Sequence, residues 1–219
     1  MGSRLRPAPV VFFQRRSQMT LPLLQREQYG KGGIGRWYWD YRDRRTLSYI
    51  RDEKIILDIG CGEGITLENL LRKFPGRTIM GIDNSLQNVA ICEQHQLPAR
   101  LGNAYELSFA DSSIDCCVFM EVIEHLEEPV TALKEIHRVL RKKGFLLLLF
   151  PNDLPFKAAR LIFLKFKEAF APSGHVKQWT PLEMQKALEE AGFEIEEVQC
   201  LPFNLWFCSL HCLIIAQKR

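Results

Sequence analysis

A glycine-rich stretch between an apolar run and an amphipathic run constrains the fold of this chain more than any other feature. Residues 56–71 read ILDIGCGEGITLENLL, with an aspartate ahead of the glycines and leucines at helical spacing behind them. A strand, a tight turn and a helix are therefore expected in that order. Such turns commonly hold a nucleotide, because glycine lets a ligand approach the backbone at the helix start.

Strand-like and helix-like segments alternate along the rest of the chain. An apolar stripe at Leu67, Leu70, Leu71 and Phe74 predicts the first helix, and Thr180 is expected to cap the last one. Strands are expected at 54–60, 78–84, 99–104, 114–122, 144–152, 193–200 and 210–217, and further helices at 85–96, 129–141 and 180–192. This order predicts an α/β fold, a doubly wound and mainly parallel sheet with its ligand site at the carboxyl ends of the strands.

The spacing of the glycines restricts the class of ligand that the turn can bind. Gly60, Gly62 and Gly64 form GxGxG, whereas a dinucleotide fingerprint needs a glycine at position 65, where Ile65 stands. Asp58 precedes the turn and places a negative charge where a phosphate would be repelled and a cation attracted. The turn therefore favours a ligand with a cationic, phosphate-free end.

A second carboxylate points to a ribose. Asp83 ends the second expected strand, and a carboxylate at that place can accept hydrogen bonds from both ribose hydroxyls. A ribose-bearing ligand with a cationic end fits S-adenosylmethionine better than NAD or ATP.

Three ordered motifs then resemble a known family. DxGxGxG at 58–64, GIDNS at 81–85 and GNAYELSFADSSIDCCVFMEVIEHLEEP at 102–129 are similar to the class I S-adenosylmethionine-dependent methyltransferases, above all to the type 11 branch with its quinone-biosynthesis enzymes. The resemblance spans roughly residues 50–217. It implies an enzyme with a Rossmann-like sheet of seven strands whose last strand is antiparallel.

The resemblance also implies a cofactor site. Its residues are Asp58, Gly60, Cys61, Gly62, Gly64, Asp83, Asn84, Asn103, Ala104, Leu107 and Glu121. The glycines would line the methionine moiety, Asp83 would hold the ribose, and Asn103, Ala104 and Leu107 would surround the adenine. Relatives commonly carry aspartate where Asn103 stands, and an amide oxygen can still accept from the adenine amino group. Cys61 is expected to be a packed residue and not a nucleophile.

Candidate catalytic residues follow the fourth expected strand. Glu121, Glu124 and His125 form an E-x-x-E-H block, which in similar quinone O-methyltransferases is tied to activation of a catechol through a divalent metal. The alternatives are that the block organises the loop without a metal, which we favour, or that His125 acts as a base. His175, in SGHVKQW, either lies over the acceptor pocket or is a surface histidine.

Two segments lie outside the expected sheet. We divide the chain into a basic N-terminal arm with an aromatic-rich helix, residues 1–45, and a methyltransferase domain, residues 46–219, with a lid insertion at 152–179. Within the insertion, residues 155–170 project as a helix with cations such as Lys165 on one side and aromatic residues such as Phe163 and Phe166 on the other. This helix is expected to cover an apolar acceptor or to lie on a membrane surface.

The cysteines and the longest apolar run indicate the cellular compartment in which the protein is expected. The 7 cysteines show no CxxC spacing, and several fall in expected strands, which favours a reducing environment. The run GFLLLLFP is far shorter than the roughly 20 residues that cross a bilayer. We therefore expect a cytoplasmic protein, with peripheral membrane contact through 155–170. The arginine-rich start fits a transit peptide, a remnant added by cloning, or an extension upstream of an initiator at Met19.

Three functions remain open on the sequence. The first is methylation, at oxygen or carbon, of a small apolar or aromatic acceptor. The second is a non-catalytic S-adenosylmethionine-binding regulatory module. The third is a protein or nucleic-acid methyltransferase, but FMEV at 119–122 replaces the (N/D)PPY motif that would clamp a base amine. A small-molecule acceptor is therefore expected, no nucleic-acid partner is, and the oligomeric state stays open.

Overall fold

A seven-stranded sheet forms the centre of the computed structural model, which describes residues 25–152 and 176–219. The strands are β1 (Ile55–Ile59), β2 (Thr78–Asp83), β3 (Ala99–Leu101), β4 (Ile114–Met120), β5 (Leu140–Pro151), β6 (Phe193–Leu201) and β7 (His211–Lys218). Their order is β3-β2-β1-β4-β5-β7-β6. β7 pairs antiparallel with both β5 and β6, and the other pairs are parallel, which confirms the expected sheet.

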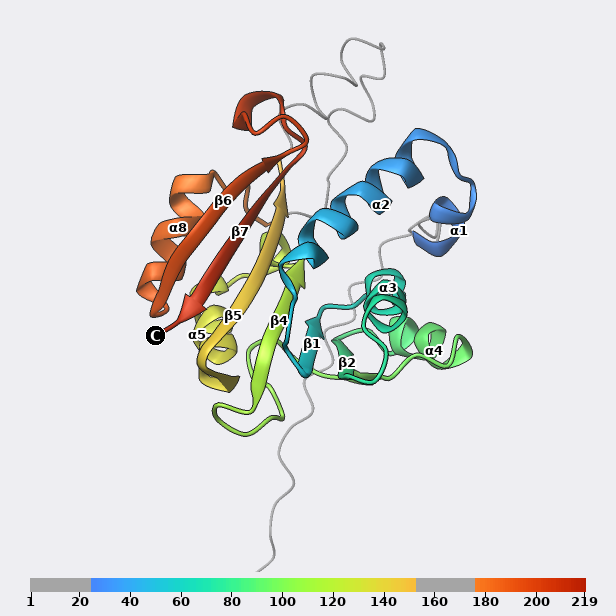
Figure 1. Ribbon diagram of the computed structural model, residues 1–219, viewed down its shortest axis with the longest axis horizontal. Coiled ribbons are helices and arrows are strands. Elements are labelled where there is room, and N and C mark those ends of the chain that lie inside the picture. The colour runs from blue at the N-terminus through green and yellow to red at the C-terminus, as the bar shows by residue number, and fades with distance from the viewer. Residues whose placement is uncertain (1–24, 153–175) are drawn as a thin grey trace, which may run out of the picture.

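Helices cover both faces of this sheet (Figure 1). They are α1 (Gln25–Gly30), α2 (Gly33–Thr46), α3 (Ile65–Lys73), α4 (Leu86–Gln94), α5 (Pro129–Val139) and α8 (Pro181–Glu190), with short 3-10 turns η1 (Leu47–Tyr49), η2 (Ile123–His125) and η3 (Trp206–Cys208). α5 and α8 lie on one side, and α2, α3 and α4 lie on the other. The doubly wound arrangement follows from the alternation of strands and helices along the chain.

Local sequence explains where these helices begin. The Ser85 hydroxyl accepts from the backbone N–H of Asn88 and caps α4. Thr180 and Glu183 form a capping box at α8, as the sequence predicted. α3 starts after Gly64, whose φ of 81° places it in the left-handed region.

The core has one apolar cluster on each face of the sheet. Every residue of β4 is buried, because this strand lies in the centre and is covered on both sides. On one face, Leu133 of α5 and Leu188 of α8 pack against strand residues such as Phe119. On the other face, Leu67 and its neighbours in α3 pack against a second set of strand residues. The sheet is therefore a rigid base for the loops at its edge.

Two predicted boundaries differ from the structure. α5 ends at Val139 and β5 begins at Leu140, whereas the helix was expected to reach 141 and the strand to begin at 144. Leu140 pairs with Ile114, and the register then shifts before Cys116, so β5 is longer than its apolar run. The predicted lid helix at 155–170 lies outside the described residues.

Candidate active site

The glycine turn needs glycine for both conformation and space. Gly60, Gly62 and Gly64 have φ angles of 71°, 54° and 81°. A Cβ on Gly60 would lie 2.3 Å from a methyl group of Val122, and one on Gly64 would lie 2.5 Å from Leu97. Side chains at these two positions would clash, so the turn can keep this path only with glycines.

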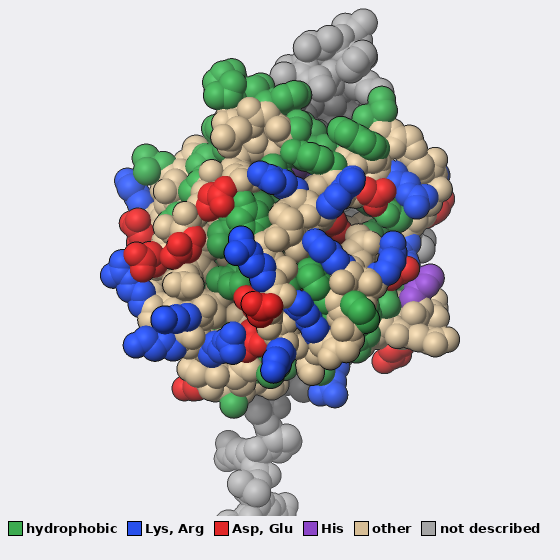
Figure 2. All heavy atoms as spheres, in the orientation of Figure 1, with side chains coloured by type: hydrophobic (Ala, Val, Ile, Leu, Met, Phe, Trp, Pro, Cys, Tyr) green, Lys and Arg blue, Asp and Glu red, His purple; other side chains and the backbone are tan. Residues whose placement is uncertain are grey.

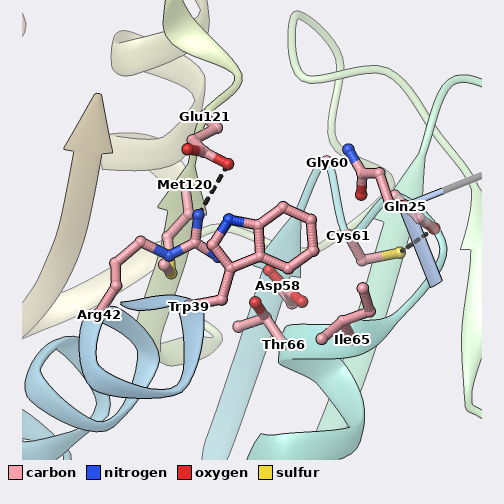
Figure 3. A pocket seen from close by; sticks show the side chains of 11 residues that line it. Gln25, Trp39, Arg42, Asp58, Gly60, Cys61, Ile65, Thr66, Met120 and Glu121 are labelled. Carbon is pink, nitrogen blue, oxygen red and sulfur yellow. Dashed lines mark hydrogen bonds and ion pairs between the residues drawn. The ribbon is translucent and has the colours of Figure 1, made fainter. Parts of the chain in front are cut away.

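A pocket opens beside this turn (Figure 3). Its lining residues are Gln25, Trp39, Arg42, Asp58, Gly60, Cys61, Gly62, Ile65, Thr66, Met120 and Glu121. The β1–α3 turn, the end of β4 and the N-terminal helices α1 and α2 each supply part of this wall. The pocket thus lies at the carboxyl ends of the parallel strands, where ligands of such sheets bind.

Asp58 brings an uncompensated carboxyl group to the pocket. Its side chain is buried, and one oxygen, Oδ2, has no hydrogen-bond partner among the described residues. Burial raises the pKa of Asp58 to about 8, with the nearby carboxylates of Asp43 and Asp83 adding to the shift and Arg42 opposing it. A cationic ligand group is the partner that this environment lacks.

Asp83 ties three segments together at the end of β2. It accepts hydrogen bonds from the backbone N–H of Gly62 at 2.8 Å, from that of Ser85 at 2.9 Å and from the Asn88 amide at 3.0 Å. The carboxylate therefore holds the glycine turn against the start of α4. It keeps acceptor capacity for about one further hydrogen bond, because an ionised carboxylate has about four lone-pair positions.

Glu121 is held in a network of residues from three distant segments. One carboxylate oxygen lies 2.8 Å from Arg42 of α2, and the other lies 2.6 Å from Nε2 of His211 at the start of β7. Nδ1 of His211 lies 2.8 Å from the Tyr38 hydroxyl. Burial opposes ionisation of Glu121, but Arg42 and His211 outweigh it and hold its pKa well below the usual range. Glu121 is thus an anion, kept in a left-handed backbone conformation with φ 56°.

The contacts of Glu121 argue against a metal ion at the E-x-x-E-H block. Both oxygens of Glu121 are engaged by cationic or hydrogen-bonding partners. Glu124 is buried, and the half-exposed His125 ring lies 3.9 Å from it. Across 25–152 and 176–219, no three His, Cys, Asp or Glu side chains are grouped to hold a metal ion. The donor set does not fit a divalent ion, so we derive no step through one.

The N-terminal arm is fastened to the glycine turn by Glu63. This buried carboxylate accepts from the backbone N–H groups of Gln25 and Arg26, each at 2.8 Å. The Arg26 guanidinium donates back to the carbonyl of Glu63 and forms an ion pair with Glu68 at 3.0 Å. α1 therefore lies against the turn and brings Gln25 to the pocket wall.

Asp43 fastens α2 in the same way. One of its oxygens accepts from Arg42, and the other accepts from the Thr66 hydroxyl at 3.0 Å and the Asn69 amide at 2.9 Å. The carboxylate is buried between α2 and α3. It fixes the helix that carries Trp39 and Arg42 into the pocket.

The remaining predicted residues lie in several environments. Asn84 and Asn103 are exposed, and the Asn103 amide oxygen accepts from the backbone of Tyr105. Leu107 is buried in the cluster that contains Phe119 and Leu133, and the partly buried Ala104 packs against the same cluster. Burial raises the pKa of the Cys61 thiol, which leaves it a poor nucleophile. His175 lies outside the described residues.

Comparison with known proteins finds a matching family for the part of the chain that carries the glycine turn and β4. Residues 57–148 match the methyltransferase domain family. A probable S-adenosylmethionine-dependent methyltransferase of Mycolicibacterium smegmatis is 33% identical over 165 residues, which cover 73% of this chain and 61% of that protein. Residues 57–148 are a methyltransferase domain, and about three quarters of the chain is similar to an S-adenosylmethionine-dependent methyltransferase. The cofactor of this family is S-adenosylmethionine, and the uncompensated Asp58 and the glycine turn fit its cationic methionine end.

Other relatives of this methyltransferase agree in family and fold. A ubiquinone biosynthesis O-methyltransferase of Azorhizobium caulinodans is 27% identical over 176 residues, covering 75% of this chain and 67% of that protein. Among solved structures, a SAM-dependent methyltransferase from Archaeoglobus fulgidus aligns with a TM-score of 0.68 and 20% identity, over 88% of this chain and 97% of that one. The chain spans about 61% of the length of the Mycolicibacterium relative.

Sequence reasoning missed part of the methyltransferase pocket. Arg42, Thr66 and Gln25 line it, but no motif distinguished them from surface residues. Trp39 belongs to the aromatic-rich helix that was expected within residues 1–45. His211 was also missed, since it lies in an apolar strand far along the chain from Glu121.

Proposed function

We propose that this chain transfers the methyl group of S-adenosylmethionine to a small apolar or aromatic acceptor, at oxygen or carbon. The observation that carries the proposal is the buried Asp58 carboxyl group, whose free oxygen lines a pocket beside a glycine turn. When bound, the cofactor supplies a methyl group on a sulfonium, which is a good leaving group. The residues of the chain must therefore mainly bind, orient and exclude water.

Charges in the pocket match the two ends of an amino acid. Asp58 offers a carboxylate for the ammonium group of the methionine moiety. Arg42, whose guanidinium is buried in the same wall, offers a cation for its carboxylate group. Asp83 has capacity left for a ribose hydroxyl, and Asn103 and Leu107 would lie on the adenine side.

Glu121 would serve as the electrostatic centre of the acceptor side. It is ionised and lines the pocket, and Arg42 and His211 hold its two oxygens in place. A fixed anion at this place favours a cationic or proton-donating group. His125 and Glu124 stay candidate catalytic residues, with His125 half exposed to solvent. His175 stays a candidate over the acceptor.

Apolar surface supports an apolar acceptor. The loop between β6 and β7 exposes Phe203, Leu205 and Phe207 by 66%, 52% and 72%, and α2 exposes Trp37 by 61%. Hydrophobic side chains gather along the upper rim of the molecule in Figure 2. Large exposed apolar groups of this kind are typical of binding surfaces. The name of the Azorhizobium relative, a ubiquinone biosynthesis O-methyltransferase, supports methylation at oxygen.

Contact with a membrane surface is a further part of the proposal. It rests on the sequence of residues 155–170, with cations on one side and aromatic residues on the other. In the described part of the chain, no helix has the length and apolarity to cross a bilayer. We propose a cytoplasmic protein whose contact with the membrane is peripheral, through residues 155–170.

The test supplies the purified chain with methyl-labelled S-adenosylmethionine and a small-molecule extract. We expect label in an apolar, extractable product, with and without a chelator, and no label from an Asp58→Asn variant at low cofactor concentration. Mass spectrometry of the product would identify the acceptor and the atom methylated. Tight cofactor binding without any labelled product would favour the regulatory module, and label in protein or nucleic acid would overturn the proposed acceptor class.

A further inference from the structure

Two cysteines oppose each other in the last antiparallel strand pair. Cys200 of β6 and Cys212 of β7 are direct partners in the register, and both belong to the cluster on the α5–α8 face. Directly opposed residues of antiparallel strands have Cα atoms about 4.5–5.5 Å apart, and a disulfide needs about 4.4–6.8 Å. The backbone can therefore accept a disulfide here without a change of register.

The two thiols are chemically different. A hydrogen bond from Cys212 lowers the pKa of Cys200, and the same contact, together with burial, raises the pKa of Cys212. Cys200 is therefore the thiol that ionises first, and the thiolate is the reactive form. It also keeps 8% of its surface exposed, whereas Cys212 is fully buried. The pair thus has an attacking sulfur and a resolving sulfur.

The other cysteine pairs lack one of these properties. Cys61 and Cys92 also contact each other, but burial raises the pKa of both thiols. Cys116 and Cys117 are neighbours along β4, so their side chains belong to opposite clusters. A reactive thiol next to a second thiol is therefore found, among these three pairs, at Cys200 and Cys212 alone.

We propose that Cys200 and Cys212 are a dithiol site that hydrogen peroxide converts to a disulfide. The Cys200 thiolate attacks one peroxide oxygen, the O–O bond breaks, and a sulfenic acid and hydroxide form. The Cys212 sulfur then attacks the sulfenic sulfur, the S–O bond breaks, and water leaves with the Cys212 proton. The two sulfurs together lose two electrons, and the peroxide is reduced to one water and one hydroxide, which becomes a second water with the proton that Cys200 released on ionising.

The position of this site links it to the pocket. A bond between residues 200 and 212 closes a ring around the loop that exposes Phe203 and Phe207. Within that ring, His211 directly precedes Cys212 and holds Glu121 by its ring nitrogen. Oxidation would therefore fasten the hairpin that presents both the apolar loop and the partner of Glu121.

The test treats the reduced full-length chain with hydrogen peroxide and counts free thiols after denaturation. We expect the 7 thiols to fall to five with a mass loss of two hydrogens, and dithiothreitol to restore them. Peptide mapping should join the segments around Cys200 and Cys212. A Cys208→Ser variant is the matched control, because this thiol lies in the same loop, and it should form the same bond.

Single variants test the order of the steps. Cys212→Ser removes the resolving sulfur, so Cys200 should stop at a sulfenic acid that dimedone traps. Cys200→Ser should leave Cys212 reduced. Retention of all thiols in the wild-type chain, a bond mapped to another pair, or equal oxidation of Cys212 in the Cys200→Ser variant would each overturn the proposal.

Discussion

β4 and α1 represent two ways of holding a segment in place. All residues of β4 are buried, and its neighbours on both sides of the sheet are apolar. α1 buries none of its residues and is held by the carboxylate of Glu63 and the guanidinium of Arg26. Hydrophobic burial acts over a whole surface, whereas these polar contacts act at a few atoms. Stability therefore resides in the sheet, and one wall of the pocket depends on a small number of hydrogen bonds.

The largest effect is expected from a cavity in the sheet. Phe119→Ala removes a fully buried ring from the centre of β4 and should lower the free energy of unfolding by about 3–5 kcal/mol. Urea unfolding followed by circular dichroism measures this. Phe207→Ala is the matched control, because that ring is 72% exposed, and it should change the stability by less than about 0.5 kcal/mol. Equal losses in the two variants would contradict the assignment of stability to the sheet.

A smaller, local effect is expected at the arm. Glu63→Gln removes the charge that holds two backbone N–H groups of α1 and should weaken this contact by about 1.5–3 kcal/mol. Amide hydrogen exchange at residues 25–31 should become faster while exchange in β4 stays the same. The control, Glu68→Gln, removes the partly exposed ion pair with Arg26 and should cost less than about 1 kcal/mol. Unchanged exchange in the Glu63 variant would show that other contacts hold the arm.

The smallest effect is a proton released at the pocket. Because the pKa of Asp58 is raised to about 8, its carboxyl group is mostly neutral at pH 6.5 and must lose its proton to pair with the cofactor ammonium. Affinity for S-adenosylmethionine should therefore rise between pH 6 and about pH 8 and fall again at higher pH, since α-amino groups lose their proton at about 7.7–8.0 and the pair needs the ammonium form. Calorimetry at pH 6.5 in two buffers of different ionisation enthalpy counts the released proton. If an Asp58→Asn variant released as many protons on binding the cofactor, the released proton would come from another group.

The contrast between β4 and α1 also separates what the sequence could predict from what it could not. The run IDCCVFM predicted β4, and Thr180 with Glu183 predicted the start of α8, because neighbours along the chain carry these signals. The contact between Glu63 and α1 joins residues 37 and 38 positions apart, and its donors are backbone groups without a residue signature. No local pattern marks such a contact.

The candidate site also has residues that the sequence could predict and residues that it could not. Its glycines and Asp83 were visible as motifs, and their function as cofactor ligands stays a prediction. Arg42 and His211 reach Glu121 from α2 and β7, on opposite ends of the chain. Their convergence depends on how the arm and the antiparallel last strand pack, and periodicity within one segment holds no information on that packing.

If Asp83 holds the ribose, as we propose, it would distinguish the two ribose hydroxyls. Its carboxylate already accepts from Gly62, Ser85 and Asn88, so a bound ribose meets one open acceptor position instead of two. If Asp83 holds the ribose, the hydroxyl that reaches this position forms a strong bond and the other has a weaker partner. The 2′-deoxy and 3′-deoxy forms of the cofactor would then differ in affinity, although each lacks a single oxygen.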